Sequence, residues 1–184
     1  AKYGRPPERE ARSVFQSLVR SIIYQQVTGK AAAAIMARFV ALYPGEEFPS
    51  PLTVRDTSIE TLRSAGLSGQ KAAYIKDLAE KCTDGTIDER LLPAMSNDEV
   101  VEHLVRVKGI GEWTAHMFLI TTLERLDVLP VGDLGIQKGF KALYKLRKLP
   151  TPKKMEQLAK PWRPFASVAS WYLWRVADDA KLKV

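Results

Sequence analysis

Hydrophobic residues recur at helical spacing along most of the chain. After Val14 the apolar positions are Phe15, Leu18, Val19, Ile22 and Ile23. Steps of three and four residues place them on one face of an α-helix, whereas a half-buried strand would alternate residue by residue. Residues 30–43, KAAAAIMARFVALY, predict a second helix between a Thr-Gly pair and a Pro-Gly pair. The sequence contains no convincing strand pair and no internal repeat, so the pattern predicts an all-α fold.

Polar residues that suit helix N-caps precede several of the apolar-periodic stretches. Ser58, Ser68 and Ser96 each stand before such a stretch, and a serine hydroxyl accepts a backbone N–H of the first turn. Glu99 follows Ser96 at the spacing of a capping box. The helices predicted from these caps end near Gly66, Cys82 and Arg106.

Two prolines predict further helix starts. Thr151 precedes Pro152 and Arg163 precedes Pro164, and proline is favoured in the first helical turn, where its missing N–H costs nothing. The helix predicted after Pro164 carries an apolar stripe at Phe165, Val168, Trp171 and Trp174. On spacing alone, this stripe predicts packing in the core.

The composition is that of an ordinary soluble globular protein, with 46% hydrophobic and 27% charged residues. A chain of 184 residues is long enough for one large domain or two lobes with a proper core. No segment approaches the roughly 18 apolar residues of a membrane span, and AKYGRPPERE at the start has neither an initiator Met nor an apolar signal core. The single cysteine, Cys82, excludes a four-cysteine iron–sulfur cluster or zinc finger.

The chain is basic, with 28 Lys and Arg against 21 acidic residues and a net charge of +7. An excess of positive charge favours a polyanionic partner such as nucleic acid. Charge alone is a weak signal, because many basic proteins bind no nucleic acid. Whether the chain binds nucleic acid must therefore be judged from specific motifs.

The stretch VKGIGEWTAHMF places two glycines, Gly109 and Gly111, between two predicted helices. Positive φ costs glycine little, and the missing side chains allow a DNA phosphate to approach the N–H groups at the next helix start. Lys108 and Thr114 would add donors to that phosphate, and such contacts hold a duplex without reading its sequence. The alternative is an ordinary corner between two helices with glycine at the C-cap. A Gly-Ile-Gly turn followed by Thr-Ala and a very apolar helix, in a basic chain, favours the DNA-binding helix–hairpin–helix.

Asp133 lies in VLPVGDLGIQKGF, after a Pro-Val-Gly loop and before an apolar-periodic stretch. Asp is among the best helix N-caps, which is a sufficient structural role. A capping carboxylate also stays charged, because the helix dipole and the N–H groups favour the ionised form. Fixed in a cleft, such a carboxylate can stabilise a sugar that becomes an oxocarbenium ion as it loses its base, or orient the attacking water.

Together, VKGIGEWTA and the downstream VGDLGIQKGF resemble the helix–hairpin–helix DNA glycosylase superfamily, in which an Asp follows the hairpin. Within it, the chain is similar to the 3-methyladenine glycosylases of the bacterial type II and yeast kinds. SIIYQQVTGKAAAAI resembles an early helix pair of that family, and PWRPFASVASWYLW its C-terminal helix. The resemblance implies Asp133 as the catalytic residue. It also implies that the mixed α/β N-terminal domain of bacterial relatives is absent here.

The resemblance implies two helical lobes with a DNA-binding cleft between them. Residues 14–124 would form the lobe with the hairpin, and residues 1–13 with 125–184 the lobe that carries Asp133.

Trp113 stands where bifunctional members of the superfamily have a lysine that attacks the sugar and then cleaves the strand. An indole is no nucleophile, so the resemblance implies a monofunctional enzyme that hydrolyses the glycosidic bond and leaves an abasic site. A flat, electron-rich ring also attracts a methylated, cationic purine, by about 1–2 kcal/mol.

The resemblance places further side chains around the base. Trp171 matches a tryptophan that lines the base site, with Tyr172 beside it, and this leaves Trp174 to the core. Met117, one turn after Trp113, and Leu134, next to Asp133, are weaker candidates for the pocket wall.

The YQQVT stretch matches the family's wedge, the segment that fills the gap left by an everted nucleotide. Gln26 would be the wedge, where bacterial relatives use leucine, and Val27 and Thr28 would face the minor groove. The structural alternative is that Gln25 and Gln26 are simply polar residues near a helix end.

Lys108 stands where the family hairpin usually has proline. By position, the carbonyls of Val105, Val107 and Ile110 match those that hold a monovalent Na⁺ or K⁺ in several relatives. The resemblance implies no other cofactor.

We therefore predict a monofunctional alkylpurine DNA glycosylase that acts on double-stranded DNA as a monomer, without a membrane. It would work in the nucleus of a eukaryote or the nucleoid-containing cytoplasm of a bacterium. Two alternatives stay open: a glycosylase for another lesion, such as hypoxanthine, ethenoadenine or uracil, and a non-catalytic module that binds duplex or abasic DNA.

Overall fold

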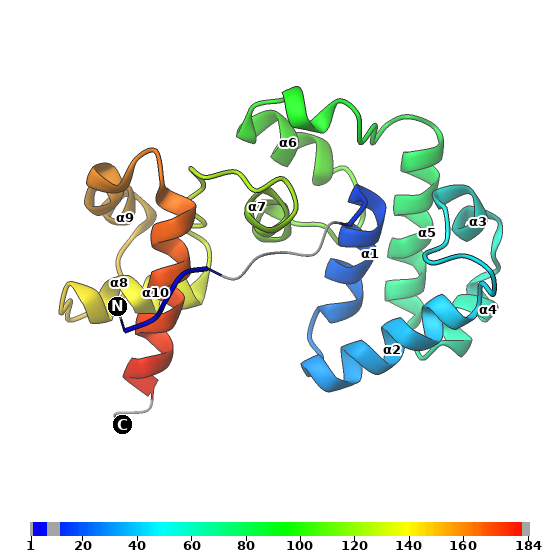
Figure 1. Ribbon diagram of the computed structural model, residues 1–184, viewed down its shortest axis with the longest axis horizontal. Coiled ribbons are helices and arrows are strands. Elements are labelled where there is room, and N and C mark those ends of the chain that lie inside the picture. The colour runs from blue at the N-terminus through cyan, green and yellow to red at the C-terminus, as the bar shows by residue number, and fades with distance from the viewer. Residues whose placement is uncertain (1, 7–11, 182–184) are drawn as a thin grey trace. The chain divides into compact units, whose positions relative to one another are not determined.

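The computed structural model describes residues 2–6 and 12–181, and every regular element within these ranges is helical (Figure 1). They divide into two compact units, one within Ala11–Phe118 and the other within Ala1–Glu10 and Leu119–Val184. The division falls inside a helix, whereas the sequence placed it after Glu124. The predicted membership of residues 1 and 7–11 lies outside the described residues. In the part of the chain that is described, every helix is too short or too polar to cross a lipid bilayer.

The first unit is a succession of short helices. They are α1 (Val14–Tyr24), α2 (Gly29–Ala41), α3 (Pro51–Asp56), α4 (Ile59–Ser64), α5 (Gly69–Thr83), the 3₁₀-helix η1 (Leu92–Ala94), α6 (Asn97–Leu104) and the first residues of α7 (Glu112–Thr121). Helix α5 packs against α1, α3 and α4, and fully buried Leu18, Ile22, Ile75 and Leu78 contribute to the core.

The predicted caps are confirmed. The hydroxyls of Ser58, Ser68 and Ser96 each accept the N–H three residues later, at 3.1, 3.2 and 3.3 Å. Glu99 accepts the Ser96 N–H at 2.7 Å and completes the capping box. Helix α3 was not predicted, although Ser50 caps it and Pro51 begins it. Its apolar residues Leu52 and Val54 are two positions apart, whereas Ile59 and Leu62 of the equally short α4 have helical spacing.

The second unit contains the last residues of α7, then α8 (Leu134–Leu143), α9 (Pro152–Ala159), the 3₁₀-helix η2 (Lys160–Trp162) and α10 (Ala166–Lys181). Its core includes Ile136, Phe140, Met155 and Leu173. Helices α8 and α10 pack closely: a Cβ on Gly139 would overlap the Leu173 main chain and lie 2.8 Å from its Cβ. Gly139 is therefore required where the two helices approach each other.

This close approach corrects two expectations for the C-terminal helix. Helix α10 begins at Ala166, not at Pro164. Its buried face comprises Ala166, Ser170, Leu173 and Ala177. The predicted aromatic stripe lies mostly outside that face: Phe165 is 53% exposed, and Trp174 is the member of the stripe that packs against the core. Both sets of residues have helical spacing, so spacing alone does not show which of them a neighbouring helix covers.

Candidate functional site

The turn between α6 and α7 needs its two glycines for different reasons. Gly109 has φ of +82°, and a Cβ there would also overlap the ring of Tyr74 on α5. Gly111 has no positive φ, and nothing lies within 4 Å of an added Cβ. The prediction of a left-handed conformation is confirmed for Gly109 and wrong for Gly111. The open backbone that phosphate approach requires is found at Gly111.

A buried carboxylate holds this hairpin. Asp77 of α5 accepts the backbone N–H of Lys108 at 2.9 Å and binds the Lys81 ammonium at 2.7 Å, while the Lys108 ammonium lies 3.5 Å away. Burial acts to raise the pKa of Asp77, but the Lys81 hydrogen bond and the Lys108 N–H outweigh it, and the pKa lies below its ordinary value. The sequence did not predict this contact. Its only signal is a charged residue within the apolar period of YIKDLAE.

The predicted wedge loop is fixed to the same hairpin. The Gln25 side-chain amide donates to the Gly109 carbonyl at 2.8 Å, and Lys71 donates to the carbonyls of Ile23 and Gln25, each at 2.7 Å. Gln26 is exposed and adopts a left-handed φ of +53°. The structure thus brings together two segments predicted to bind DNA, and it gives Gln25 a specific task that sequence did not reveal.

The remaining residues of the wedge loop face outward. Val27 and Thr28 are both exposed. The Thr28 hydroxyl also caps α2 by accepting the Ala31 N–H at 3.3 Å. The loop therefore offers accessible side chains without being loosely attached.

Asp133 is the N-cap of α8, as predicted. Its Oδ1 atom accepts the Ile136 N–H at 2.7 Å and the indole N–H of Trp174 at 2.9 Å, and the residue is 9% exposed. A Cβ on Gly135 would lie 2.8 Å from the Trp174 ring and 3.0 Å from Asp133 Oδ1. Gly135 therefore leaves the space that the indole occupies. The carboxylate is held in one orientation by donors from two helices.

The predicted packing of Trp174 against the core is confirmed, and this hydrogen bond adds a second contact that was not predicted. The ring packs against the core of the second unit, and its N–H donates a hydrogen bond to Asp133. Trp171, which was favoured for the base pocket, makes an edge contact with Tyr172 at 4.9 Å and lies 5.1 Å from the Arg175 guanidinium. The Tyr172 hydroxyl donates to the Gly4 carbonyl at 2.9 Å.

The other predicted site residues differ in accessibility. Trp113 is 49% exposed, so its indole is not sealed in the interior, and Leu134 is exposed. Met117 is half-buried. Thr114 is 6% exposed, which gives its side chain the least access to a phosphate among the predicted contacts. The roles of these residues stay predictions.

The hairpin carbonyls predicted to hold a monovalent cation belong to one exposed residue, Val105, and two buried ones, Val107 and Ile110. The Val107 carbonyl accepts the Ile110 N–H at 3.1 Å. A carbonyl oxygen has a second lone pair, so this bond is compatible with a cation ligand. Neutral oxygens suit a monovalent ion, and among the described residues no cluster of His, Cys, Asp or Glu offers a site for a more demanding metal.

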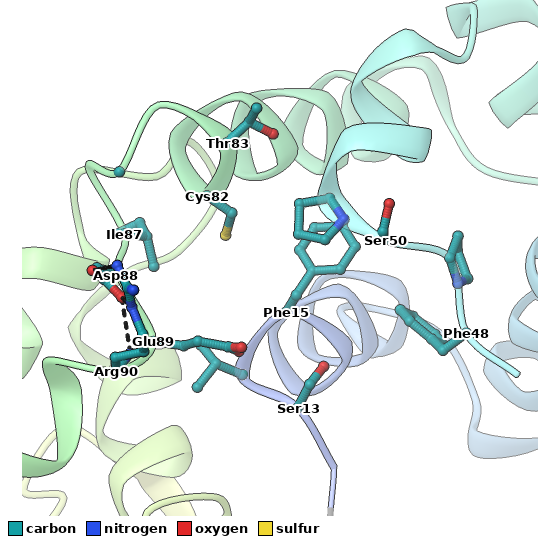
Figure 2. A pocket seen from close by; sticks show the side chains of 14 residues that line it. Ser13, Phe15, Phe48, Ser50, Cys82, Thr83, Ile87, Asp88, Glu89 and Arg90 are labelled. Carbon is teal, nitrogen blue, oxygen red and sulfur yellow. Dashed lines mark hydrogen bonds and ion pairs between the residues drawn. The ribbon is translucent and has the colours of Figure 1, made fainter. Parts of the chain in front are cut away.

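A cavity of about 450 Å³ lies elsewhere in the first unit, against the N-terminal end of α1 and the C-terminal end of α5. Phe15 and the Cys82 sulfur point into it, and Arg90 and Asp88 pair at its edge (Figure 2). Burial, followed by the Glu89 and Asp84 carboxylates, raises the pKa of Cys82 to about 12. The thiol therefore stays protonated and is no nucleophile. None of the predicted site residues lines this cavity, whereas the wedge loop follows the other end of α1.

The described residues thus include a glycine hairpin with open backbone beside the start of α7 and a carboxylate held in one orientation at the start of α8, the two features expected of a protein that binds a phosphate backbone and uses a fixed negative charge. Residues 19–164 match the family described as HhH-GPD superfamily base excision DNA repair protein, and the chain belongs to that family. The predicted family and its all-α fold are confirmed.

The most informative relatives are glycosylases of fungi and bacteria. The chain is 37% identical over 172 residues to DNA-3-methyladenine glycosylase 1 of Schizosaccharomyces pombe, covering 93% of this chain and 75% of the relative. A solved 3-methyladenine DNA glycosylase of that yeast, in complex with abasic DNA, superposes with a TM-score of 0.81 at 36% identity, over 94% of this chain and 85% of that one. For the DNA-3-methyladenine glycosidase of Bacillus halodurans the TM-score is 0.84 at 40% identity, over 93% and 79% of the two chains.

Proposed function

We propose that this protein is a monofunctional DNA glycosylase that excises alkylated purines, such as 3-methyladenine and 7-methylguanine, from double-stranded DNA in base excision repair. The observation that carries the proposal is the carboxylate of Asp133, nearly buried and held by the Ile136 and Trp174 N–H groups. The names of the relatives at 35–37% identity support the substrate class. Such an enzyme acts where the genome lies, in a nucleus or a nucleoid.

The first step is to take the damaged nucleotide out of the stack, because its glycosidic bond is shielded inside a duplex. The open backbone at Gly111 and the first N–H groups of α7, with Lys108, would hold a phosphate. Gln26, exposed at the apex of a loop anchored by Gln25 and Lys71, would fill the gap. A polar wedge replaces apolar filling with hydrogen bonds to the unpaired partner base.

The everted nucleoside then loses its base. The bond between the purine nitrogen and C1′ breaks, its electron pair leaves with the base, and a cationic methylated purine departs neutral. Asp133 stabilises the positive charge that develops on the sugar, because a fixed carboxylate needs no reorganisation at that moment. Water adds to C1′ and loses a proton, and an abasic site remains.

Selection of the lesion is assigned to aromatic side chains. The half-exposed indole of Trp113 would stack on the base and attract its positive charge. Trp171, Tyr172, Met117 and Leu134 are proposed as further pocket residues. The lesion's own weakened glycosidic bond adds to selectivity, because neutral bases both stack less favourably and leave less readily.

The essential test replaces Asp133 with Asn, which keeps the shape and removes the charge. We expect release of 3-methyladenine from methylated duplex DNA to fall by at least about 10²-fold, the loss typical of one electrostatic element, while binding to an abasic-site duplex persists. Turnover within a few fold of the wild type would contradict the role of Asp133. A panel of duplexes with single lesions, including hypoxanthine, ethenoadenine and uracil, defines the substrate range.

Absence of strand cleavage is a separate prediction. It depends on Trp113, since the chain has an indole where lyases have a lysine. Borohydride treatment during turnover should trap no protein–DNA adduct, and the product strand should break only after alkali. A trapped adduct would show a Schiff base and would require an amine nucleophile in the site.

The alternative in another class is a module that binds abasic or duplex DNA without processing a base. The hairpin would serve both functions equally. The buttressed orientation of Asp133 favours the enzyme, since a capping role alone needs only the Ile136 N–H and not the Trp174 indole.

A further inference from the structure

The net positive charge of the chain is confined to one part of the sequence. Residues 138–163, here the basic segment, contain nine Lys and Arg and a single acid, Glu156. The other residues of the chain hold 19 cations and 20 acids, so the basic segment accounts for the whole excess. Its cations are Lys138, Lys141, Lys145, Arg147, Lys148, Lys153, Lys154, Lys160 and Arg163.

These cations are accessible and mostly not neutralised by the protein. All nine are exposed. Of these nine, Arg163 alone has an ion-pair partner within the described ranges, Asp127 at 2.9 Å. Elsewhere in the chain, lysines such as Lys81 are paired with carboxylates. An unpaired, solvated cluster is the form in which charge attracts a polyanion over distance.

Helix stability does not account for the pattern. Lys141 lies in the last turn of α8, where a cation is favourable, but Lys153 and Lys154 lie in the first turn of α9. A cation at a helix N-terminus opposes the macrodipole and costs up to about 1 kcal/mol. The sequence therefore retains charge at positions where the fold gains nothing from it.

The basic segment is compact and connected to Asp133. The Phe140 and Trp162 rings stack at 5.1 Å, and the Tyr144 hydroxyl donates to the Leu158 carbonyl at 3.4 Å, so the two ends of the segment lie together. Helix α8 begins directly after Asp133 and carries Lys141 about 12 Å along its axis, at about 1.5 Å per residue. The cations are thus held at a fixed position relative to the carboxylate.

The hairpin unit is close to electrically neutral. Residues 11–118, which contain the hairpin and the wedge loop, hold 12 cations and 13 acids. Its contacts with phosphate would come chiefly from neutral backbone N–H groups, with Lys108 as the added charge. Such contacts orient a duplex, but they release few counterions.

We propose that the basic segment is a second DNA-binding surface, which supplies sequence-independent affinity for the phosphate backbone of duplex DNA while the hairpin fixes its position. The proposal rests on the proposed function in that duplex DNA is the substrate. Charge complementarity and the rigid connection to Asp133 favour DNA. Exposed Leu143 and Leu149 within the segment make an anionic membrane the competing partner to test.

The experiment replaces Lys141, Lys145 and Lys148 with Gln in the full chain. The matched control replaces half-buried Arg55 and exposed Arg63 and Arg90, all in the hairpin unit, with Gln and so removes the same charge. Affinity for an undamaged duplex is measured over a series of KCl concentrations. Each lost phosphate contact lowers the slope of log affinity against log salt by about 0.9. We expect the lysine variant to lose about 2–3 in slope and at least tenfold in affinity at low salt, with the control close to wild type.

Two further measurements distinguish failure of this proposal from failure of the proposed glycosylase function. Thermal unfolding should be unchanged in both variants, and single-turnover base release at saturating enzyme should be the same as in wild type. If neither the wild type nor the variants release a base, the proposed function fails, but the affinities measured over the KCl series still decide the role of the basic segment. Equal slopes for the lysine variant and the control would overturn the proposal. So would tighter binding to phosphatidylserine vesicles or to single-stranded RNA than to duplex.

Discussion

At the scale of single residues, the most consequential contact is the hydrogen bond from Trp174 to Asp133. It joins a predicted catalytic carboxylate to a side chain that spacing assigned to the core. One indole therefore has two tasks, since its ring packs against the core and its N–H orients Oδ1. Periodicity reports that a residue is half-buried, but it does not report what the polar atom of an amphipathic ring will meet.

Replacing Trp174 with Phe should separate these tasks, because an aromatic ring remains and the donor is lost. We expect the single-turnover rate to fall about 10–100-fold, which corresponds to one charged hydrogen bond, while affinity for an abasic duplex changes by less than a few fold. In an Asp133→Asn background the substitution should have little further effect on rate.

The matched control is Trp162→Phe, since Trp162 stacks on Phe140 in the same unit. It should lower stability without changing the single-turnover rate. An equal loss of rate in both variants would mean that Trp174 acts through packing alone and does not position Asp133.

At the scale of elements, the conformation of the hairpin depends on contacts from other helices. Asp77 on α5 accepts the Lys108 N–H, the Tyr74 ring covers Gly109, and Gln25 at the end of α1 binds the Gly109 carbonyl. The turn is thus clamped by two other helices. The glycines allow the backbone path, and the clamp selects it.

Replacing Asp77 with Asn should destabilise the fold by about 1.5–3 kcal/mol, because a buried charged hydrogen-bond network loses its charge, and should weaken duplex binding. The pKa of Asp77 is lowered in the folded state. Its stabilisation is therefore fully present above the ordinary carboxyl pKa of about 4 and is lost as pH falls through the lower, folded value.

Urea unfolding of both proteins at several pH values measures this difference. The advantage of wild type over Asp77→Asn should shrink below about pH 4. Asp56→Asn, which removes an exposed carboxylate paired with Arg55, is the control and should change the free energy of unfolding little, because solvent screens an exposed ion pair. A cost no larger than that of the control would show that the hairpin does not depend on Asp77.

At the scale of the whole molecule, sequence predicted most of what is local. Helices with a side-chain cap, such as those after Ser58, Ser68 and Ser96, were located because a cap and a period of 3.6 residues coincide. The family followed from two motifs close together in the chain. Helix α3 was missed in spite of its Ser50 cap, because its apolar Leu52 and Val54 are not at helical spacing. The buried face of α10 was misassigned because helical spacing does not show how closely a neighbouring helix approaches.

The contacts that shape the candidate site were beyond sequence for a different reason. Asp77 lies 31 residues before Lys108, and Trp174 lies 41 residues after Asp133. Hydrogen bonds over such separations depend on how whole helices pack, and they leave no local pattern. The sequence therefore named the carboxylate and the hairpin, but not the groups that hold them in place.

The bond from Gln25 to the Gly109 carbonyl has a consequence for how the enzyme scans undamaged DNA. This bond joins the hairpin proposed to hold the strand to the loop proposed to probe between bases, so a movement of one segment disturbs the other. In the proposed function, the hairpin would contact a phosphate and the loop would enter the stack at the same time, so weaker phosphate binding would also mean less insertion of the loop. A change at Gln25 would therefore alter both the speed of scanning and the stringency with which bases are tested.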